Sequence, residues 1–199
     1  MPLDRPNQPQ TPPAPLPPDG LLPRAVHHHP PAGLILARSQ FDQILAHLRA
    51  SLPKEGCGLL ATIRGDTLAE LEGPERAVRF YPGSNIDDSV TRYTMDPMEV
   101  LAALRDMETN GWRLGAIVHS HPASPPTPSP TDLREAHYQG ALMMIVSFAA
   151  RDPVARAWAI AALPQSEVDT GAPASPFREA PVIIHDAIVE RPPGRGNPA

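Results

Sequence analysis

His119-Ser120-His121-Pro122 and, seven residues after it, Ser129-Pro130-Thr131-Asp132 form the stretch on which the fold and the chemistry depend. Side chains two positions apart on a strand point to the same face, so His119 and His121 can bind one ion together. Asp132 can supply a third ligand. Three ligands of this kind suit zinc and leave a fourth position for water. The stretch therefore predicts a catalytic site with one Zn²⁺ per chain.

The same residues also fit a structural role. Ser129 and Asp132 match an S-x-x-D capping box, and Pro130 occupies the first position of the helix that would follow. The two histidines would then be ordinary core or surface residues. Both interpretations can hold, because a cap at Ser129 would fix Asp132 opposite the strand end. The loop from Pro122 to Pro130 contains five prolines, and such a stiff loop should hold the site open at little entropic cost.

Proline content confines a folded core to the middle of the chain. Of 28 prolines in 199 residues, 11 lie in residues 1–32 and seven follow Leu163. Residues 1–32 have too few apolar side chains to offset the entropy lost on ordering, so we expect a disordered arm. Residues 33–163 should form one domain. Residues 164–199 should form a Pro-rich tail, with either an edge strand or an irregular segment at 182–189.

Charge and hydropathy disfavour several classes of partner. The net charge is −5, the two signs are mixed, and no cluster of Lys and Arg predicts nucleic-acid binding. No apolar run reaches the roughly 18 residues of a membrane span, and we recognise no secretory signal. A single cysteine, Cys57, excludes an intrachain disulfide. We therefore expect a cytoplasmic protein without a membrane partner; the sequence does not specify its oligomeric state.

In the first half of the expected core region, the apolar spacing predicts two helices among short strands. One helix should begin with Ser39 as its N-cap and stop before Pro53. The second should begin at Asp96, with Pro97 in the first turn. Strands at 59–63 and 67–71 should form a hairpin. The strands expected in this half are 34–36, 59–63, 67–71, 77–81 and 92–95.

The second half predicts buried strands on either side of the histidine and aspartate motifs. Residues 112–119 and 141–149 are largely apolar, as in strands buried on both faces. A turn at 151–153 should lead into a further strand at 154–163. Together with the helix that begins near Ser129, this order predicts an α+β fold, an α/β sandwich in which helices flank one mixed sheet.

Glu55 is the candidate for the base that a zinc-bound water requires. A base within hydrogen-bond reach contributes roughly 10² to 10⁴-fold to a rate. Glu55 directly precedes Gly56-Cys57-Gly58 at a strand start, where its side chain can face a site. The alternative is a solvated carboxylate that follows Pro53-Lys54. Spacing does not decide between the two.

Several motifs together resemble the JAMM (MPN+) zinc metalloprotease family over residues 34–163. They are Glu55 to Leu60, Asn85, Tyr93 to Pro97, and the H-S-H-P and S-P-T-D elements. The resemblance implies a cytidine-deaminase-like fold, zinc ligands at His119, His121 and Asp132, and Glu55 as general base. It also implies that the Ser129 hydroxyl helps to stabilise a tetrahedral oxyanion. No ligand is missing, which argues against the inactive, scaffolding branch.

Three residues near the site have competing interpretations. A lone cysteine near histidines suggests a thiol nucleophile, but we expect Cys57 to be a buried, unreactive thiol beside a tight glycine turn. Tyr93 and Met95 are expected to pack in the core; the alternative places them at the border of a substrate groove.

The resemblance also implies a class of substrate. The family cleaves amide or isopeptide bonds after the C-terminal glycines of ubiquitin-like proteins. The segment between Glu55 and His119 is short, as in compact prokaryotic members, some of which act on sulfur-carrier proteins with the ubiquitin-like fold. An extended glycine tail can add to a sheet edge as a strand. The leading hypothesis is a zinc peptidase for a ubiquitin-like or sulfur-carrier protein.

Two alternatives remain. One is a RadC-like member of the wider fold, linked to DNA repair, against which the lack of a basic patch argues. The other is a non-catalytic interaction module whose Pro-rich arm binds the partner.

Overall fold

The computed structural model describes residues 29–65, 67, 72–136, 138, 140–160 and 177–186. Within them, one eight-stranded mixed sheet has the strand order β7-β6-β5-β4-β2-β3-β1-β8. Helices cover both faces, so the predicted α+β sandwich is confirmed. The strands are β1 (Leu34–Ala37), β2 (Cys57–Ile63), β3 (Glu75–Gly83), β4 (Arg113–His121), β5 (Leu142–Ser147), β6 (Val154–Ile160), β7 (Phe177–Ala180) and β8 (Val182–His185).

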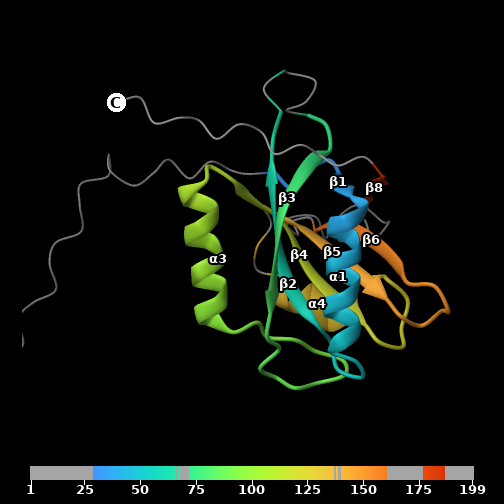
Figure 1. Ribbon diagram of the computed structural model, residues 1–199. Coiled ribbons are helices and arrows are strands. Elements are labelled where there is room, and N and C mark those ends of the chain that lie inside the picture. The colour runs from blue at the N-terminus through green and yellow to red at the C-terminus, as the bar shows by residue number, and fades with distance from the viewer. Residues whose placement is uncertain are drawn as a thin grey trace, which may run out of the picture.

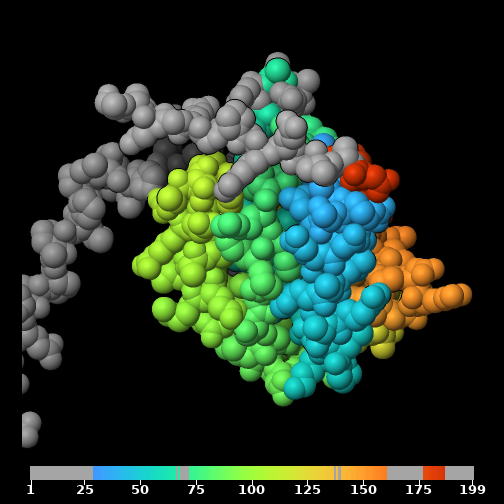
Figure 2. Space-filling model, in the orientation of Figure 1, coloured from blue at the N-terminus to red at the C-terminus, as the bar shows by residue number. Residues whose placement is uncertain are grey.

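Two long helices lie on opposite sides of strands β2 and β3 (Figure 1). Helix α1 (Arg38–Ala50) buries Phe41, Ile44 and Leu48 in the larger core cluster. Helix α3 (Pro97–Thr109) covers the other face with Ala103 and Met107. On the outside of the molecule, α3, β3 and α1 form one continuous surface (Figure 2). The third helix, α4 (Pro130–Glu135), is a short element beside the C-terminal end of β4.

The pairing of β4 with its two neighbours, in the middle of the sheet, determines which side chains lie beside His119. Strand β4 pairs antiparallel with β2, with Cys57 opposite His119, and parallel with β5, with His119 opposite Ile145. Directly paired residues share a face of the sheet. His119, Cys57 and Ile145 therefore lie on the face that α3 covers. Every residue of β5 is buried, as expected for a strand with both faces covered.

The two edges of the sheet are joined by one extended segment. Strand β7 pairs antiparallel with β6, and after Pro181 the chain continues as β8, which pairs parallel with β1. The Pro181 carbonyl also accepts a hydrogen bond from the N–H of Leu34. The edge strand expected within 182–189 is present at Val182–His185. The strand at Phe177–Ala180 was not expected, because its four residues follow a segment whose Pro, Ala and Ser content is typical of a tail.

The start of α1 differs from the prediction. The helix begins at Arg38, directly after β1, and Ala37 occupies the N-cap position in place of Ser39. The Gln40 side-chain oxygen accepts a hydrogen bond from the N–H of Ala37 at 2.9 Å. A glutamine that reaches back to the cap N–H therefore replaces the expected serine cap, and Ser39 lies within the first turn.

The region between β2 and α3 also differs. Strand β2 pairs antiparallel with β3 on the side away from β4, and the strand expected at 67–71 as its hairpin partner falls almost entirely outside the described residues. The strand expected at 92–95 is wrong: only an isolated bridge joins Met95 to Asn85. The reason is that the Asn85 side chain binds the main chain of Arg92 and Thr94, which occupies groups that a strand would pair.

Residues 1–28 and 187–199 lie outside the described residues, so the disordered arm, the histidines at 27 and 28 and the division of the chain at residues 32 and 163 remain predictions. Among the described helices, none has both the length and the apolar content needed to cross a membrane.

Candidate metal centre

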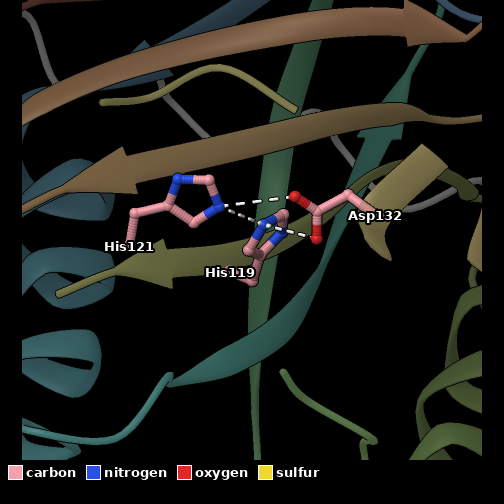
Figure 3. Close-up of side chains that lie close together, drawn as sticks. All are labelled: His119, His121 and Asp132. Carbon is pink, nitrogen blue, oxygen red and sulfur yellow. Dashed lines mark hydrogen bonds and ion pairs between the residues drawn. The ribbon is translucent and has the colours of Figure 1, made fainter. Parts of the chain in front are cut away.

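The two histidines project side by side from the end of β4. Strand β4 continues through His121, two residues further than predicted, so His119 and His121 are extended neighbours on one face. Their Nε2 atoms are 3.2 Å apart. Both side chains are buried, His119 completely. The strand therefore directs two imidazole nitrogens to one point (Figure 3).

Asp132 reaches the same point from the start of α4. The N–H of Ser129 donates to Asp132 Oδ2 at 2.7 Å, and the N–H of Asp132 donates to Ser129 Oγ at 3.1 Å. This is the capping box expected from the sequence. The carboxylate oxygens lie 3.5 Å from His119 Nε2 and 3.4 Å from His121 Nε2. The cap thus holds Asp132 against the histidine pair.

The spacing of these atoms fits a tetrahedral ion. With bonds of about 2.0 to 2.2 Å to zinc, neighbouring ligand atoms of a tetrahedron lie about 3.3 to 3.6 Å apart. The separations of 3.2, 3.5 and 3.4 Å among the three side chains are close to these values. The three side chains supply two imidazoles and one carboxylate, ligand types that suit zinc. His119, His121 and Asp132 together could hold a metal ion.

A main-chain contact sets the proton position on one histidine. His121 Nδ1–H donates to the carbonyl oxygen of Pro125 at 2.7 Å, which leaves Nε2 free as a lone-pair donor. Pro125 belongs to the Pro-rich loop, so this loop orients a ligand as well as spanning the gap. The other imidazole, His119, stacks on Tyr93, with ring centroids 4.6 Å apart and an interplanar angle of 23°. Each ring is therefore held in place by a neighbour outside the ligand set.

Glu55 lies beside this cluster and is almost fully buried, with 4% of its surface exposed. Among the described residues, its Oε2 is one of two buried side-chain atoms without a hydrogen-bond partner, the other being His119 Nδ1. Burial raises the pKa of Glu55 to about 7, against a lowering effect of His121 and a smaller raising effect of Asp132. A carboxylate with a free oxygen and a pKa near neutrality is suited to accept and return a proton.

The neighbouring groups have shifted pKa values as well. Burial lowers the pKa of His119, which favours the neutral imidazole that a metal requires. Burial alone would raise the pKa of Asp132, but the contacts with both histidines outweigh it and hold the pKa below its usual range. Asp132 therefore stays ionised next to the histidine nitrogens.

Ser129 stands at the N-cap of α4, and its hydroxyl oxygen accepts the cap hydrogen bond. A hydroxyl that accepts one bond keeps its own proton for donation. The geometry is thus compatible with the predicted role of Ser129 toward an oxyanion, which remains a proposal.

Cys57 is fully buried opposite His119, and its Sγ contacts the Gly83 carbonyl oxygen at 3.7 Å. Burial raises the pKa of this thiol to about 12. A thiolate is the reactive form, so the thiol-nucleophile alternative is disfavoured. Tyr93 and Met95 line an apolar cavity of about 600 Å³ that also borders Asp132.

Three contributors to the site were not found from the sequence. The carbonyl of Pro125 acts through the main chain, which leaves no mark in the residue type. Tyr93 was expected to pack, with the border of a groove as the alternative, and it does line the cavity; its stacking on His119, however, depends on the path of the loop before α3. Ser120 was noted only as the spacer between the histidines, although its hydroxyl accepts a buried hydrogen bond. A serine between two buried histidines on one strand was the sequence feature that could have indicated this hydrogen bond.

Comparison with known proteins identifies the family of this chain. The model for prokaryotic homologues of the JAB domain matches residues 37–161. A protein of Thermus thermophilus named a probable TtuB-protein conjugate cleaving protease is 38% identical over 110 residues, which cover 54% of this chain and 67% of the relative. A desampylase of Haloferax volcanii is 34% identical over 119 residues, covering 57% and 80%. A CysO-cysteine peptidase of Mycobacterium tuberculosis is 34% identical over 120 residues, covering 60% and 75%.

Among solved structures, a protein of Desulfitobacterium hafniense superposes with a TM-score of 0.63 at 32% sequence identity, over 78% of this chain and 95% of that one. A protein of Salinibacter ruber superposes with a TM-score of 0.52 at 28% identity, over 76% and 91%. Both agree with the sheet and helices described above. Because the family model matches residues 37–161, more than half of its length, the chain belongs to the prokaryotic JAB-domain branch of the JAMM (MPN+) family.

Proposed function

We propose that this protein is a zinc-dependent peptidase or isopeptidase that hydrolyses the amide bond after the C-terminal glycines of a ubiquitin-like or sulfur-carrier protein. The observation that carries the proposal is the convergence of His119, His121 and Asp132 at tetrahedral spacing beside a buried carboxylate with a free oxygen.

Each side chain of the site has a separate role in the proposed hydrolysis. His119, His121 and Asp132 would hold one Zn²⁺, which when bound acts as a Lewis acid and lowers the pKa of water at the site toward about 7. Glu55 takes the proton from the attacking water at its free Oε2 and later delivers it to the leaving amine. The Ser129 hydroxyl donates to the oxygen on which negative charge develops. Burial of Glu55 and the histidines keeps bulk water away from these transfers.

The class of substrate is supported by the relatives. The three described above are named for the cleavage of TtuB-protein conjugates, for desampylation and for hydrolysis of CysO-cysteine. Two of these names state what is cleaved, a TtuB-protein conjugate and CysO-cysteine. A flexible glycine tail is narrow enough to approach a site whose ligand atoms are all buried.

The experiment begins with the zinc content of the purified protein. The protein is then incubated with a ubiquitin-like carrier extended beyond its terminal Gly-Gly, and the products are identified by mass spectrometry. We expect cleavage directly after the second glycine, loss of activity with a chelator, and recovery on adding Zn²⁺. Glu55→Gln should lower kcat by about 10² to 10⁴-fold while zinc is retained; His119→Ala should lose zinc as well.

Glu179→Gln is the matched control, because it makes the same carboxylate-to-amide change at an exposed position on β7. Cleavage that persists undiminished in Glu55→Gln or His119→Ala would contradict the mechanism. Cleavage at another bond would contradict the substrate class while leaving the hydrolase assignment in place.

A further inference from the structure

The main chain at Glu55 and Gly56 forms hydrogen bonds with three other residues. The N–H of Glu55 donates to the Ser89 carbonyl at 2.9 Å, and its carbonyl accepts from Asn85 Nδ2 at 2.9 Å. The Gly56 carbonyl accepts from the N–H of Ser120 at 3.0 Å. The Gly56 N–H donates to the side-chain hydroxyl of Ser120 at 2.8 Å. All four main-chain polar groups of this dipeptide are thus paired.

The last of these bonds departs from a normal ladder. In a hydrogen-bonded antiparallel pair, two opposed residues exchange N–H to carbonyl bonds in both directions. The pairing of β2 with β4 ends at Cys57 and His119. At the next pair, Gly56 and Ser120, one bond has the usual carbonyl acceptor and the other has the serine hydroxyl. The regular pairing of β2 with β4 therefore changes at Gly56, the residue next to Glu55.

Packing on the other side of Gly56 limits its freedom. A Cβ atom at this position would lie 2.8 Å from Ser51 Oγ and 3.0 Å from Leu48 Cδ2, both at the end of α1. Glycine lets the main chain sit in this narrow space between α1 and Ser120. Ser120 itself is completely buried. Its hydroxyl therefore has no bulk water with which to exchange the Gly56 hydrogen bond.

We propose that Ser120 is the positioning residue for the general base: its hydroxyl replaces a main-chain carbonyl and thereby sets where Glu55 stands relative to His119 and His121. The inference rests on the proposed function, in which Glu55 moves the proton. Ser120 does not touch the substrate. It joins the strand that carries two ligands to the segment that carries the base, so a shift of one is transmitted to the other.

A positioning role for Ser120 predicts effects that a merely structural role would not produce. Loss of the hydroxyl should leave the histidines in place, because β4 is still paired with β5 on its other side. It should free the Gly56 N–H and misplace the base. A misplacement of about 1 Å can cost about 10²-fold in rate. The expected effect is thus on kcat, and on neither metal affinity nor KM.

The test compares Ser120→Ala, Ser120→Thr and the control Thr62→Val. Thr62 is also fully buried on β2, and its hydroxyl donates to Glu75 at 2.6 Å, far along the strand from Gly56. Three quantities are measured: kcat and KM on the extended carrier, Co²⁺ affinity of the metal-free protein by absorption, and hydrogen exchange of the Gly56 amide by NMR. Ser120→Ala should lower kcat by about 10 to 100-fold, keep KM and Co²⁺ affinity, and speed Gly56 exchange. Ser120→Thr keeps the hydroxyl, so its kcat, Co²⁺ affinity and Gly56 exchange rate should match the wild type. Thr62→Val should change none of these quantities.

An unchanged kcat in Ser120→Ala would overturn the inference, as would a loss of Co²⁺ affinity in proportion to the loss of rate. If Ser120→Ala does not fold, Ser120→Cys keeps a side chain of similar size with a weaker acceptor and should lower kcat in the same direction. If the wild type itself hydrolyses no carrier, the proposed function fails. Gly56 exchange and Co²⁺ affinity then still decide whether Ser120 holds this segment, and unchanged exchange would overturn it.

Discussion

At the scale of single residues, the charge of Glu55 depends on whether the neighbouring ligands hold a metal ion. Without a metal, burial makes the ionised form costly and the pKa rises to about 7. A divalent cation on His119, His121 and Asp132 would reverse that effect, because an opposite charge nearby favours the carboxylate. The base would then be ready for proton transfer when the cation is bound.

This linkage predicts a pH-dependent difference in stability between the metal-free wild type and Glu55→Gln. The carboxyl has a pKa of 4.5 when unfolded and about 7 when folded, so its contribution is fully present below 4.5 and is lost as the pH rises through 7. At pH 8, metal-free Glu55→Gln should therefore be the more stable protein, by on the order of 1 to 3 kcal/mol. Thermal unfolding in chelator from pH 4 to pH 8 measures the difference.

The two melting temperatures should converge near pH 4, where the glutamate is protonated in both states. Adding Zn²⁺ at pH 8 should shrink or reverse the difference. Equal melting temperatures at pH 8 in chelator would contradict the assigned burial of Glu55.

Cys57 gives a second test at this scale. Because burial raises its pKa to about 12, native protein should react with iodoacetamide at least about 10²-fold more slowly than unfolded protein. Mass spectrometry of the folded and the denaturant-treated protein measures the modification. Rapid native alkylation that also abolishes activity would revive the thiol-nucleophile alternative.

At the scale of elements, α4 is a short helix whose position depends on its first turn. Its six residues are too few to form a stable helix alone. The cap between Ser129 and Asp132 fixes the start, and the Pro125 carbonyl ties the preceding loop to His121. The helix start and the metal centre therefore form a single unit.

Ser129→Ala should consequently weaken both the helix start and the metal site. Loss of an N-cap side chain costs about 0.5 to 2 kcal/mol of stability, and loss of a group that orients a ligand costs about 10 to 100-fold in metal affinity. Urea unfolding and Co²⁺ titration of the metal-free protein measure the two effects. The control is Asp96→Ala, which removes the cap of α3, where the side chain accepts from Met98 and Glu99. It should lower stability to a similar extent without weakening Co²⁺ binding; equal losses of affinity in both variants would show that the effect is general.

Elements with strong local signals could be predicted from the sequence. Helix α3 has its cap, its first-turn proline and its apolar stripe in the sequence, and it begins at Pro97 as expected. The histidine and aspartate motifs likewise predicted a strand end and a helix start that meet. The false strand at 92–95 shows the limit. Its residues have strand-like composition, but Asn85, seven residues earlier, binds their main chain.

At the scale of the whole molecule, long-range pairing was beyond the reach of local patterns. Strand β7 has four residues, two of them exposed charged side chains, and it follows a Pro-rich segment. Nothing local distinguishes it from a tail. Its position depends on the free edge of β6, which becomes apparent only when the sheet is assembled.

A chain that ends after residue 163 should therefore be much less stable than one that ends after residue 186. The shorter chain loses β7 and β8, leaves the edges of β6 and β1 unpaired, and uncovers core residues that pack against Ala180 and Ile184. Unpaired edges also favour association between chains. Thermal unfolding and light scattering measure both effects. If the two chains melt at the same temperature, β7 and β8 add no stability to the domain.

The pairing of β8 with β1 also has a consequence for protein synthesis. The outer partner of β1 is made almost 150 residues after β1 itself; Arg38 and Asp186, which form an ion pair beside this junction, are 148 positions apart. At about 5 to 20 residues per second, β1 waits roughly 7 to 30 s with one side unpaired. His119, His121 and Asp132 emerge during that interval. The nascent chain can therefore gather its metal ligands before the sheet is closed.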